Sequence, residues 1–266
     1  MRSTRLGGML GTLFLFLAVP VTHAQSDASG VYWHTDPRVK SCSMVIDPSL
    51  TQAEWSRFTR QAGATVSFKA LGSAETLGKR HFKVVVDYSN TPVDQHDRAW
   101  INTFTHPSYK DCPLGDAIRI PSIRAEMGVS DHTDVGGYWT TAPNANYGLV
   151  GGELKYAFRQ DSRKLPAAAV RASVSMLTGV PDFNMIVPGV DLIASTRIAA
   201  FTPYVGLKEA LSIGTETTSK VDLHKESIAI TQPYAGVVCA IWKVSLAAEY
   251  DVSSVNTLAL TAGVSL

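Results

Sequence analysis

Val170-Arg171-Ala172-Ser173-Val174-Ser175-Met176 alternates along its length between apolar side chains and small, polar or charged ones. A period of two residues is that of a β-strand, and it places the two kinds of side chain on opposite faces of a sheet. The same pattern recurs in residues 154–158, 190–195 and 244–250. Several such strands in series, joined by turns, indicate a closed sheet.

The N-terminus has the features of an export signal. Arg2 and Arg5 precede an apolar run from Met9 to Val21, and a cleavage point follows before Gln25. An exported chain with alternating strands is typical of the bacterial outer membrane. We therefore expect an all-β protein, a single antiparallel transmembrane β-barrel of 10–12 strands with a short N-terminal helix. The predicted parts are a signal peptide (1–24), an N-terminal segment with the helix (25–62) and the barrel (63–266).

Eleven stretches of the chain are candidates for strands: 64–71, 82–88, 117–129, 135–141, 147–159, 166–177, 187–198, 201–212, 230–242, 244–252 and 255–266. Single-chain bacterial barrels have an even number of strands, so we expect 12, with 10 as the alternative and the conflict within residues 25–90. The polar segment 89–116 is predicted to be a long loop with a short helix near residues 98–104. Long loops of such barrels face the cell exterior, and the same expectation holds for 213–229.

A short helix is predicted to begin at Thr51. Thr51 suits the N-cap, and Glu54 three residues later completes a capping box. Trp55 and Phe58 then share one face of the helix, which is expected to end near Ala62. The sequence leaves two locations open for this helix, the periplasm and the inside of the barrel, where it would form a plug. We favour the periplasm.

Alternation alone does not say which face of the barrel is apolar, because a soluble barrel places its apolar residues inside. Three features favour an apolar outer face, beside the export signal. Several strand candidates reach the ~9–11 residues of a membrane crossing, and their polar faces are rich in Gly, Ser and Ala, as suits a narrow lumen. Aromatic residues also fall near strand ends, as expected of interfacial girdles: Tyr147, Phe158, Phe201, Tyr204, Tyr234, Trp242 and Tyr250.

Composition excludes two classes of protein. Without residues 1–24 the chain loses Arg2 and Arg5, which leaves 24 − 2 = 22 Lys+Arg against 23 Asp+Glu, and the formal net charge falls from +1 to −1. Nucleic acid as a partner would require a strongly basic surface. A mean hydropathy of +0.05 and the lack of an apolar run of about 20 residues after position 24 exclude a helical membrane protein.

The chain has three cysteines, Cys42, Cys112 and Cys239. The periplasm is oxidising, so a bridge between Cys42 and Cys112 is compatible with export, and the sequence leaves its formation open. Cys239 lies within a strand candidate and is expected to serve as a small apolar residue.

Motifs spread over most of the chain after residue 50 resemble a largely uncharacterised family of outer-membrane barrels among the exported proteins of proteobacteria. They are residues 50–55, 151–157, 170–173 with 177–180, and 201–206. The resemblance implies a barrel in the outer membrane and implies no activity. One departure is the final residue, because such barrels usually end on an aromatic residue that helps the assembly machinery recognise the last strand, whereas this chain ends at Leu266.

If the apolar face meets lipid, ten charged side chains are expected in the lumen, because Arg or Lys facing lipid at mid-membrane costs about 2–4 kcal/mol. They are Lys83, Asp87, Arg124, Glu126, Glu153, Lys155, Arg171, Asp191, Arg197 and Glu249. They suit either a polar pore or solute site, or a network of mutual salt bridges that fills a narrow barrel. The balance of five basic and five acidic residues favours the network, because a selective pore shows one sign in excess.

The function expected from these features is that of a small pore or transporter for an unidentified small solute, or of a structural membrane protein. The alternative is a binding or adhesion module that works through the loops 89–116 and 213–229, and a membrane-embedded lipid hydrolase is less favoured. Outer-membrane lipid and the barrel-assembly machinery are the expected partners.

We expect no enzyme, no cofactor and no metal site. Ser173, Ser175 and Ser195 lie on polar strand faces, but no histidine has an evident serine partner, and no Gly-x-Ser-x-Gly motif occurs. The segment Asp131-His132-Thr133-Asp134 is interpreted as a solvated turn in preference to a cation site.

Overall fold

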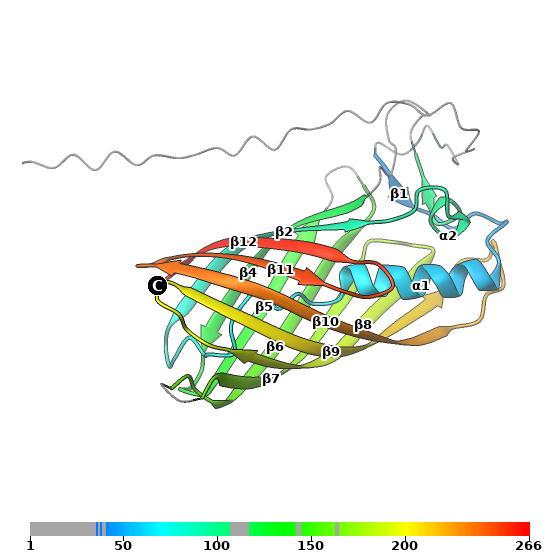
Figure 1. Cartoon of the computed structure of the whole chain (residues 1–266). Coiled ribbons are helices and arrows are strands. Elements are labelled where there is room, and N and C mark those ends of the chain that lie inside the picture. Colours follow the sequence, from blue (N-terminus) through cyan, green and yellow to red (C-terminus); the bar gives the residue numbers. More distant parts are fainter. Residues whose placement is uncertain (1–35, 37, 39–40, 107–116, 142–144, 163–164) are drawn as a thin grey trace, which may run out of the picture.

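The chain folds as a closed β-barrel with a helix inside it (Figure 1). The computed structural model describes residues 36, 38, 41–106, 117–141, 145–162 and 165–266, so the predicted signal peptide lies outside the described residues. Ten antiparallel strands close the barrel in the order β10-β11-β12-β2-β4-β5-β6-β7-β8-β9. Their bounds are β2 (Phe82–Pro92), β4 (Ala117–Gly128), β5 (Thr133–Thr141), β6 (Gly148–Arg159), β7 (Ala167–Thr178), β8 (Phe183–Ser195), β9 (Phe201–Glu216), β10 (Glu226–Ile241), β11 (Val244–Asp251) and β12 (Thr257–Ser265).

The barrel is all-β and antiparallel as predicted, and its ten strands lie within the predicted range of 10–12. Within that range, the structure has the alternative number, 10, and not the favoured 12. Residues 64–71, expected to be a strand, contain the end of helix α1 (Gln52–Val66) and a stretch without strand pairing. β1 (Ser43–Met44) and β3 (Phe104–Thr105) form a separate two-stranded sheet.

The first and last strands of the wall lie side by side. β12 pairs with β2, and the backbones of Phe82 and Leu266 exchange hydrogen bonds of 3.1 and 2.7 Å. Following the paired residues once around the wall shifts the register by about twelve residues. Eight-stranded barrels are just filled by side chains and sixteen-stranded ones leave a channel, so ten strands enclose a narrow lumen.

Most of the large apolar side chains of the wall point outward, and most of its charged ones point inward. Leu192 on β8 is 59% exposed and Leu246 on β11 is 53% exposed, while Arg171 and Asp191 are each 2% exposed. This order is the reverse of a soluble barrel and is the construction of an outer-membrane barrel. The prediction that the apolar face points outward is therefore confirmed.

The aromatic residues near strand ends are divided between the two faces. Tyr204 and Tyr234, predicted to lie in girdles, point inward instead, because their hydroxyl groups donate hydrogen bonds to Glu249 and Asp191. Tyr147 is half-buried and packs against a cluster inside the barrel. The exposed members of the predicted set are Phe158, Phe201, Trp242 and Tyr250.

Replacing Leu192 by arginine is expected to lower the free energy of unfolding in a bilayer by about 2–4 kcal/mol, because it puts a charge in the lipid-facing belt. Denaturant unfolding in lipid vesicles measures this loss. Ile198→Arg is the matched control, because Ile198 is 61% exposed but lies in the turn after β8, where an interfacial charge costs about 0–1 kcal/mol. Equal small losses in the two variants would mean that the outer face of β8 meets water.

The connections at the two ends of the barrel differ in length. At one end, β10 and β11 are joined by residues 242–243 alone. At the other, residues 93–116 join β2 to β4 and residues 217–225 join β9 to β10. We call these the turn end and the loop end. Helix α2 (Arg98–Ile101) lies in the first of the long connections, where the sequence predicts a short helix.

Helix α1 lies inside the barrel, which corrects the favoured periplasmic location (Figure 1). It contacts β8, β9 and β10 from the lumen side, and Trp55 and Phe58 are completely buried. After the helix the chain continues through the lumen to the turn end, where the backbone N–H of Leu77 donates to Asp134 on β5. We call residues 51–77 the plug. Among the described residues, no helix has the length and apolarity needed to cross a membrane.

Candidate functional site in the barrel lumen

The plug begins with a hydrogen-bonded cap that also ties it to α2. The Thr51 hydroxyl accepts from the backbone of Glu54, and the Glu54 carboxylate accepts from the backbone of Thr51 at 3.0 Å, as the predicted capping box requires. The same carboxylate accepts from the Asn102 amide at 3.1 Å and pairs with Arg98 at 3.0 Å. Burial alone would raise the pKa of Glu54, but these hydrogen bonds, together with Arg98, outweigh it and lower the pKa.

Replacing Glu54 by alanine is expected to destabilise the folded protein by about 1–2 kcal/mol at pH 7. Because the pKa of Glu54 is lower in the folded than in the unfolded chain, its contribution is complete above the unfolded value of about 4.3 and is lost as the pH falls through the folded value. The difference between wild type and variant should therefore shrink from pH 7 to pH 3 in denaturant unfolding. A difference that stays constant over this range would contradict the assignment.

An aromatic cluster holds α1 at the loop end. The ring centroid of Phe58 lies 5.8 Å from that of Trp55, 5.2 Å from that of Trp100 and 5.6 Å from that of Phe183. Trp100 belongs to α2 and Phe183 begins β8, so the cluster joins the plug to both a connecting loop and the wall. The Trp100 indole also donates to the Gln61 side chain at 2.5 Å.

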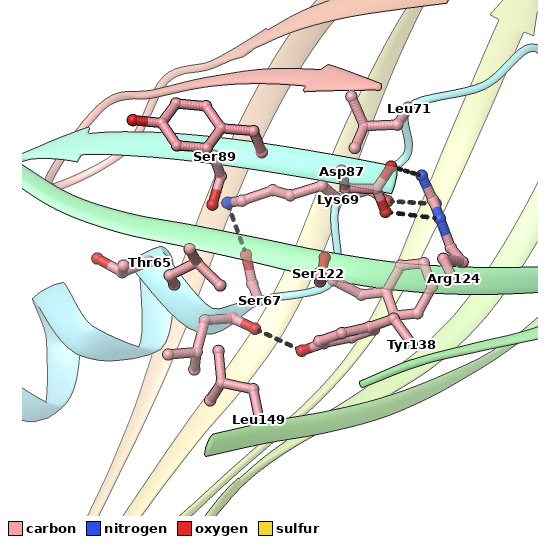
Figure 2. Close-up of a pocket in the computed structure, with 14 residues that line it drawn as sticks. Thr65, Ser67, Lys69, Leu71, Asp87, Ser89, Ser122, Arg124, Tyr138 and Leu149 are labelled. Atoms are coloured by element: carbon pink, nitrogen blue, oxygen red, sulfur yellow. Dashed lines mark hydrogen bonds and ion pairs between the residues drawn. The ribbon is translucent and has the colours of Figure 1, made fainter. Parts of the chain in front are cut away.

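Deeper in the lumen, Arg124 joins the wall to the plug. Its guanidinium pairs with Asp87 at 3.1 Å (Figure 2). It also donates to the backbone oxygens of Lys69 and Ala70, each at 3.2 Å. Glu126 lies 3.4 Å away on the same strand. Arg124 is 1% exposed, so a buried charge is matched here by two carboxylates and by the backbone of the plug.

A second buried arginine, Arg171, pairs with Asp191 on β8 and with Glu153 on β6, the latter at 3.3 Å. Both guanidiniums lie against the ring of Phe68 in the plug, at 5.3 Å from its centroid for Arg171 and 5.7 Å for Arg124. A cation is attracted to the face of an aromatic ring. Phe68 therefore fills the lumen where the charges of the wall converge.

The irregular part of the plug finds hydrogen-bond partners on side chains of the wall. The backbone N–H groups of Ala70 and Leu71 donate to the Glu249 carboxylate at 3.0 and 2.8 Å. The Lys208 ammonium donates to the carbonyl oxygen of Phe68. Buried backbone groups must be paired, so these side chains take the place of a neighbouring strand.

Of the ten predicted lumen residues, Arg197 is the one that the structure places elsewhere. It lies in the turn after β8, with a side chain that is 62% exposed and pairs with Glu75 at 2.6 Å. The predicted strand ran to residue 198, whereas β8 ends at Ser195, and the alternation of faces ends with it. The other nine face the lumen: Lys83, Asp87, Arg124, Glu126, Glu153, Lys155, Arg171, Asp191 and Glu249.

Sequence reasoning missed a second group of charges in the lumen. The ammonium groups of Lys69 and Lys208 each lie 3.9 Å from a carboxylate oxygen of Asp251, and all three side chains are buried. Lys208 and Glu209 are neighbours on β9, so alternation sends one inward and the other outward. Lys208 faces the lumen, and Glu209 faces outward, where it accepts a hydrogen bond from Thr231 at 3.0 Å.

Little space remains beside the plug in the part of the lumen shown in Figure 2. A cavity of about 40 Å³ lies there between the plug and the wall, lined among others by Ser67, Ser122 and Tyr138. A water molecule requires ~10–15 Å³ of such volume, so this cavity has room for a few waters. The Tyr138 hydroxyl donates to the carbonyl oxygen of Val66 at 3.4 Å and closes it toward α1.

Two candidates considered above for catalysis or cation binding, Ser195 and the Asp131–Asp134 segment, make contacts that stabilise the fold. The Ser195 hydroxyl accepts a hydrogen bond from the backbone of Ala74 in the plug at 3.0 Å. In the Asp131–Asp134 segment, Asp134 pairs with Lys155 at 3.0 Å. Within the described ranges there is no group of three or more His, Cys, Asp or Glu side chains that could hold a metal ion.

The cysteines differ in their bonding. Cys42, beside β1, forms a disulfide, and Cys239 is a free thiol on β10. Cys112, the partner suggested by the sequence, lies outside the described residues.

No family model matches the chain, and no curated protein matches it in sequence. Several solved structures resemble it. Ail, the attachment invasion locus protein of Yersinia pestis, solved with the heparin analogue sucrose octasulfate, is 12% identical with a TM-score of 0.33, covering 71% of this chain and 99% of its own. An outer membrane channel from Pseudomonas putida F1 is 10% identical with a TM-score of 0.43, covering 73% and 98%. Neisserial surface protein A is 14% identical with a TM-score of 0.30, covering 70% and 96%.

These sequence identities and TM-scores are too low to support an inference about the residues in the lumen. The fold of this chain is established by its own strand pairing and by the outward direction of its apolar side chains.

Proposed function

We propose that the protein is an outer-membrane barrel that does not conduct in its resting form and that acts by binding at its loop end. The observation that carries this proposal is the plug. Arg124, Lys208 and Glu249 on the wall all bind its backbone, and the ring of Phe68 lies in the lumen against Arg124 and Arg171. An open pore would have to give up these buried contacts, whereas binding at the loop end leaves them intact.

The loop end offers a firmly attached surface for such binding. The Asn146 side chain exchanges hydrogen bonds of 2.8 and 2.7 Å with the backbone of Met44. The backbone N–H of Ile46 donates to Asp182, between β7 and β8, at 2.9 Å. The segment before the plug is thereby fixed to two connections of the barrel. Long connections face the cell exterior in outer-membrane barrels, so we place this surface outside the cell.

Planar-bilayer conductance tests the closed state. Purified protein is expected to give no steady current steps, while an open porin reconstituted in parallel shows that the assay works. Steady, solute-sensitive steps from the wild-type protein would overturn the proposal and favour a transporter.

Cysteine labelling in intact cells tests which end is outside. In a Cys239→Ser background, Ser49→Cys at the loop end should react with a membrane-impermeant maleimide. Lys243→Cys, in the turn between β10 and β11, should react only after the outer membrane is permeabilised. Both positions are exposed, so labelling depends only on whether the maleimide can reach that side of the outer membrane. The reverse labelling would place the loop end in the periplasm.

A gated pore for a small solute is the second candidate. The observation in its favour is that residues 67–77 have neither helix nor strand and rely on side chains of the wall. Such a segment is the part of the plug that a stimulus would release first. In planar-bilayer recordings, a current that appears only in bursts would support the gated pore. With either function, we propose outer-membrane lipid and the barrel-assembly machinery as partners, since the apolar outer face requires a bilayer.

A further inference from the structure

Strand β4 borders a cavity near the loop end of the barrel. It pairs with β2 from Ala117 to Met127 and, among the residues that the structure describes, with β5 over Ile123–Gly128. Pro121 has no N–H to donate, and its carbonyl oxygen accepts a hydrogen bond from the Thr140 hydroxyl.

An apolar cavity of about 180 Å³ lies beside β4. Its lining combines the plug, the segment before it and the wall, with the apolar side chains of Met44, Ala62, Val66, Ile120, Leu149 and Leu177. Arg119 and Pro121 face outward on β4 and Ile120 faces inward, and all three line the cavity. The cavity therefore extends from the lumen to the edge of the wall.

The polar groups of the lining are largely satisfied by the protein. The Thr65 hydroxyl donates to the carbonyl oxygen of Gln61 at 2.9 Å, and the Thr140 hydroxyl is bound to Pro121. Burial raises the pKa of Tyr147, so its hydroxyl stays neutral. Arg119 is the charged residue of the lining, and it is exposed on the outer side. The inner lining thus favours an uncharged ligand.

We propose that this cavity binds a small uncharged hydrophobic molecule of about the size of one aromatic ring. An apolar cavity of about 150 Å³ in another protein stays dry and takes up benzene or xenon, so 180 Å³ of similar lining suits a ligand of this class. This proposal rests on the proposed function only in that the ligand is one that binds at the loop end.

Anomalous diffraction from crystals exposed to iodobenzene tests the proposal directly. We expect one strong iodine peak in contact with Ile120 and Leu149. Leu149→Trp, which fills the cavity, should remove the peak, and Leu192→Trp on the outer face should leave it unchanged. No peak in the wild-type cavity, or an equal peak in Leu149→Trp, would overturn the proposal.

A measurement in solution covers the case in which Leu149→Trp fails to fold. Titration of the wild-type protein with fluorobenzene, followed by ¹⁹F NMR, should show saturable binding beyond detergent partition. The smaller change Ile120→Phe should weaken that binding at least tenfold. Non-saturable partition alone would overturn the proposal. Neither experiment depends on conductance, so failure here and failure of the closed barrel are distinguishable.

Discussion

Replacing Arg171 by methionine is expected to lower the free energy of unfolding by about 3–5 kcal/mol, because removing one partner of a buried ion pair leaves the other charge uncompensated. Here two carboxylates are left, Asp191 and Glu153, whose side chains are 1% and 8% exposed. Denaturant unfolding of the two proteins in the same lipid vesicles at pH 7 measures the difference.

Two further variants separate the loss of charge pairing from the loss of packing. Arg197→Met removes an arginine whose side chain is 62% exposed, so it should cost about 1 kcal/mol or less. Combining Arg171→Met with Asp191→Asn and Glu153→Gln should recover much of the loss, because no unpaired charge remains in the lumen. If Arg171→Met costs no more than Arg197→Met, the guanidinium is not buried among these carboxylates.

Replacing Phe58 by alanine is expected to destabilise the protein by about 3–5 kcal/mol and to let current through the barrel. The cost is that of truncating a fully buried phenylalanine, and Phe58 holds the plug helix against Trp55, Trp100 and Phe183. Unfolding by denaturant gives the first quantity and planar-bilayer recording gives the second.

Phe82→Ala is the matched control for this prediction, because Phe82 lies on the outer face of β2 and is already 37% exposed. Its replacement should cost less and leave the bilayer silent. Equal costs in Phe58→Ala and Phe82→Ala would show that α1 does not pack in the lumen as described.

The barrel and the direction of its faces could be predicted because the pattern allows few alternatives. Arg171 and Asp191 alternate with apolar residues, and an arginine turned toward lipid at mid-membrane costs about 2–4 kcal/mol. Once the sheet is taken as closed and membrane-embedded, such residues have only the lumen to face. The same reasoning identifies Arg124 and Glu249 and fails for Arg197, which lies two residues beyond the end of its strand.

The plug could not be predicted, because alternation reports which residues are buried and not what covers them. Ala64, Val66, Phe68 and Ala70 alternate with other residues as a strand does, and all four are buried. They are surrounded by the inside of the barrel, and wall side chains supply the hydrogen bonds that a strand would receive from a neighbouring backbone. Likewise, Trp55 and Phe58 indicate that one face of α1 is buried, but they do not indicate what covers that face.

Lys208 and Glu209 show a further limit of the sequence. Strand alternation requires the two to face opposite ways, but it does not say which one enters the lumen. The contacts decide it, because Lys208 reaches both Asp251 and the backbone of the plug, while Glu209 has the Thr231 hydroxyl beside it.

Disulfide trapping of the plug against the wall tests the account most directly. A Cβ atom at Gly214 on β9 would lie 2.7 Å from Oγ1 of Thr59 in α1, close to the separation of a Cβ and the opposite sulfur in a disulfide. In a Cys239→Ser background, Thr59→Cys with Gly214→Cys should therefore cross-link in the folded protein in cells. Thr59→Cys with Thr215→Cys should not, because Thr215 alternates to the outer face. Absence of the first cross-link, or equal cross-linking in both pairs, would contradict a helix held inside the barrel.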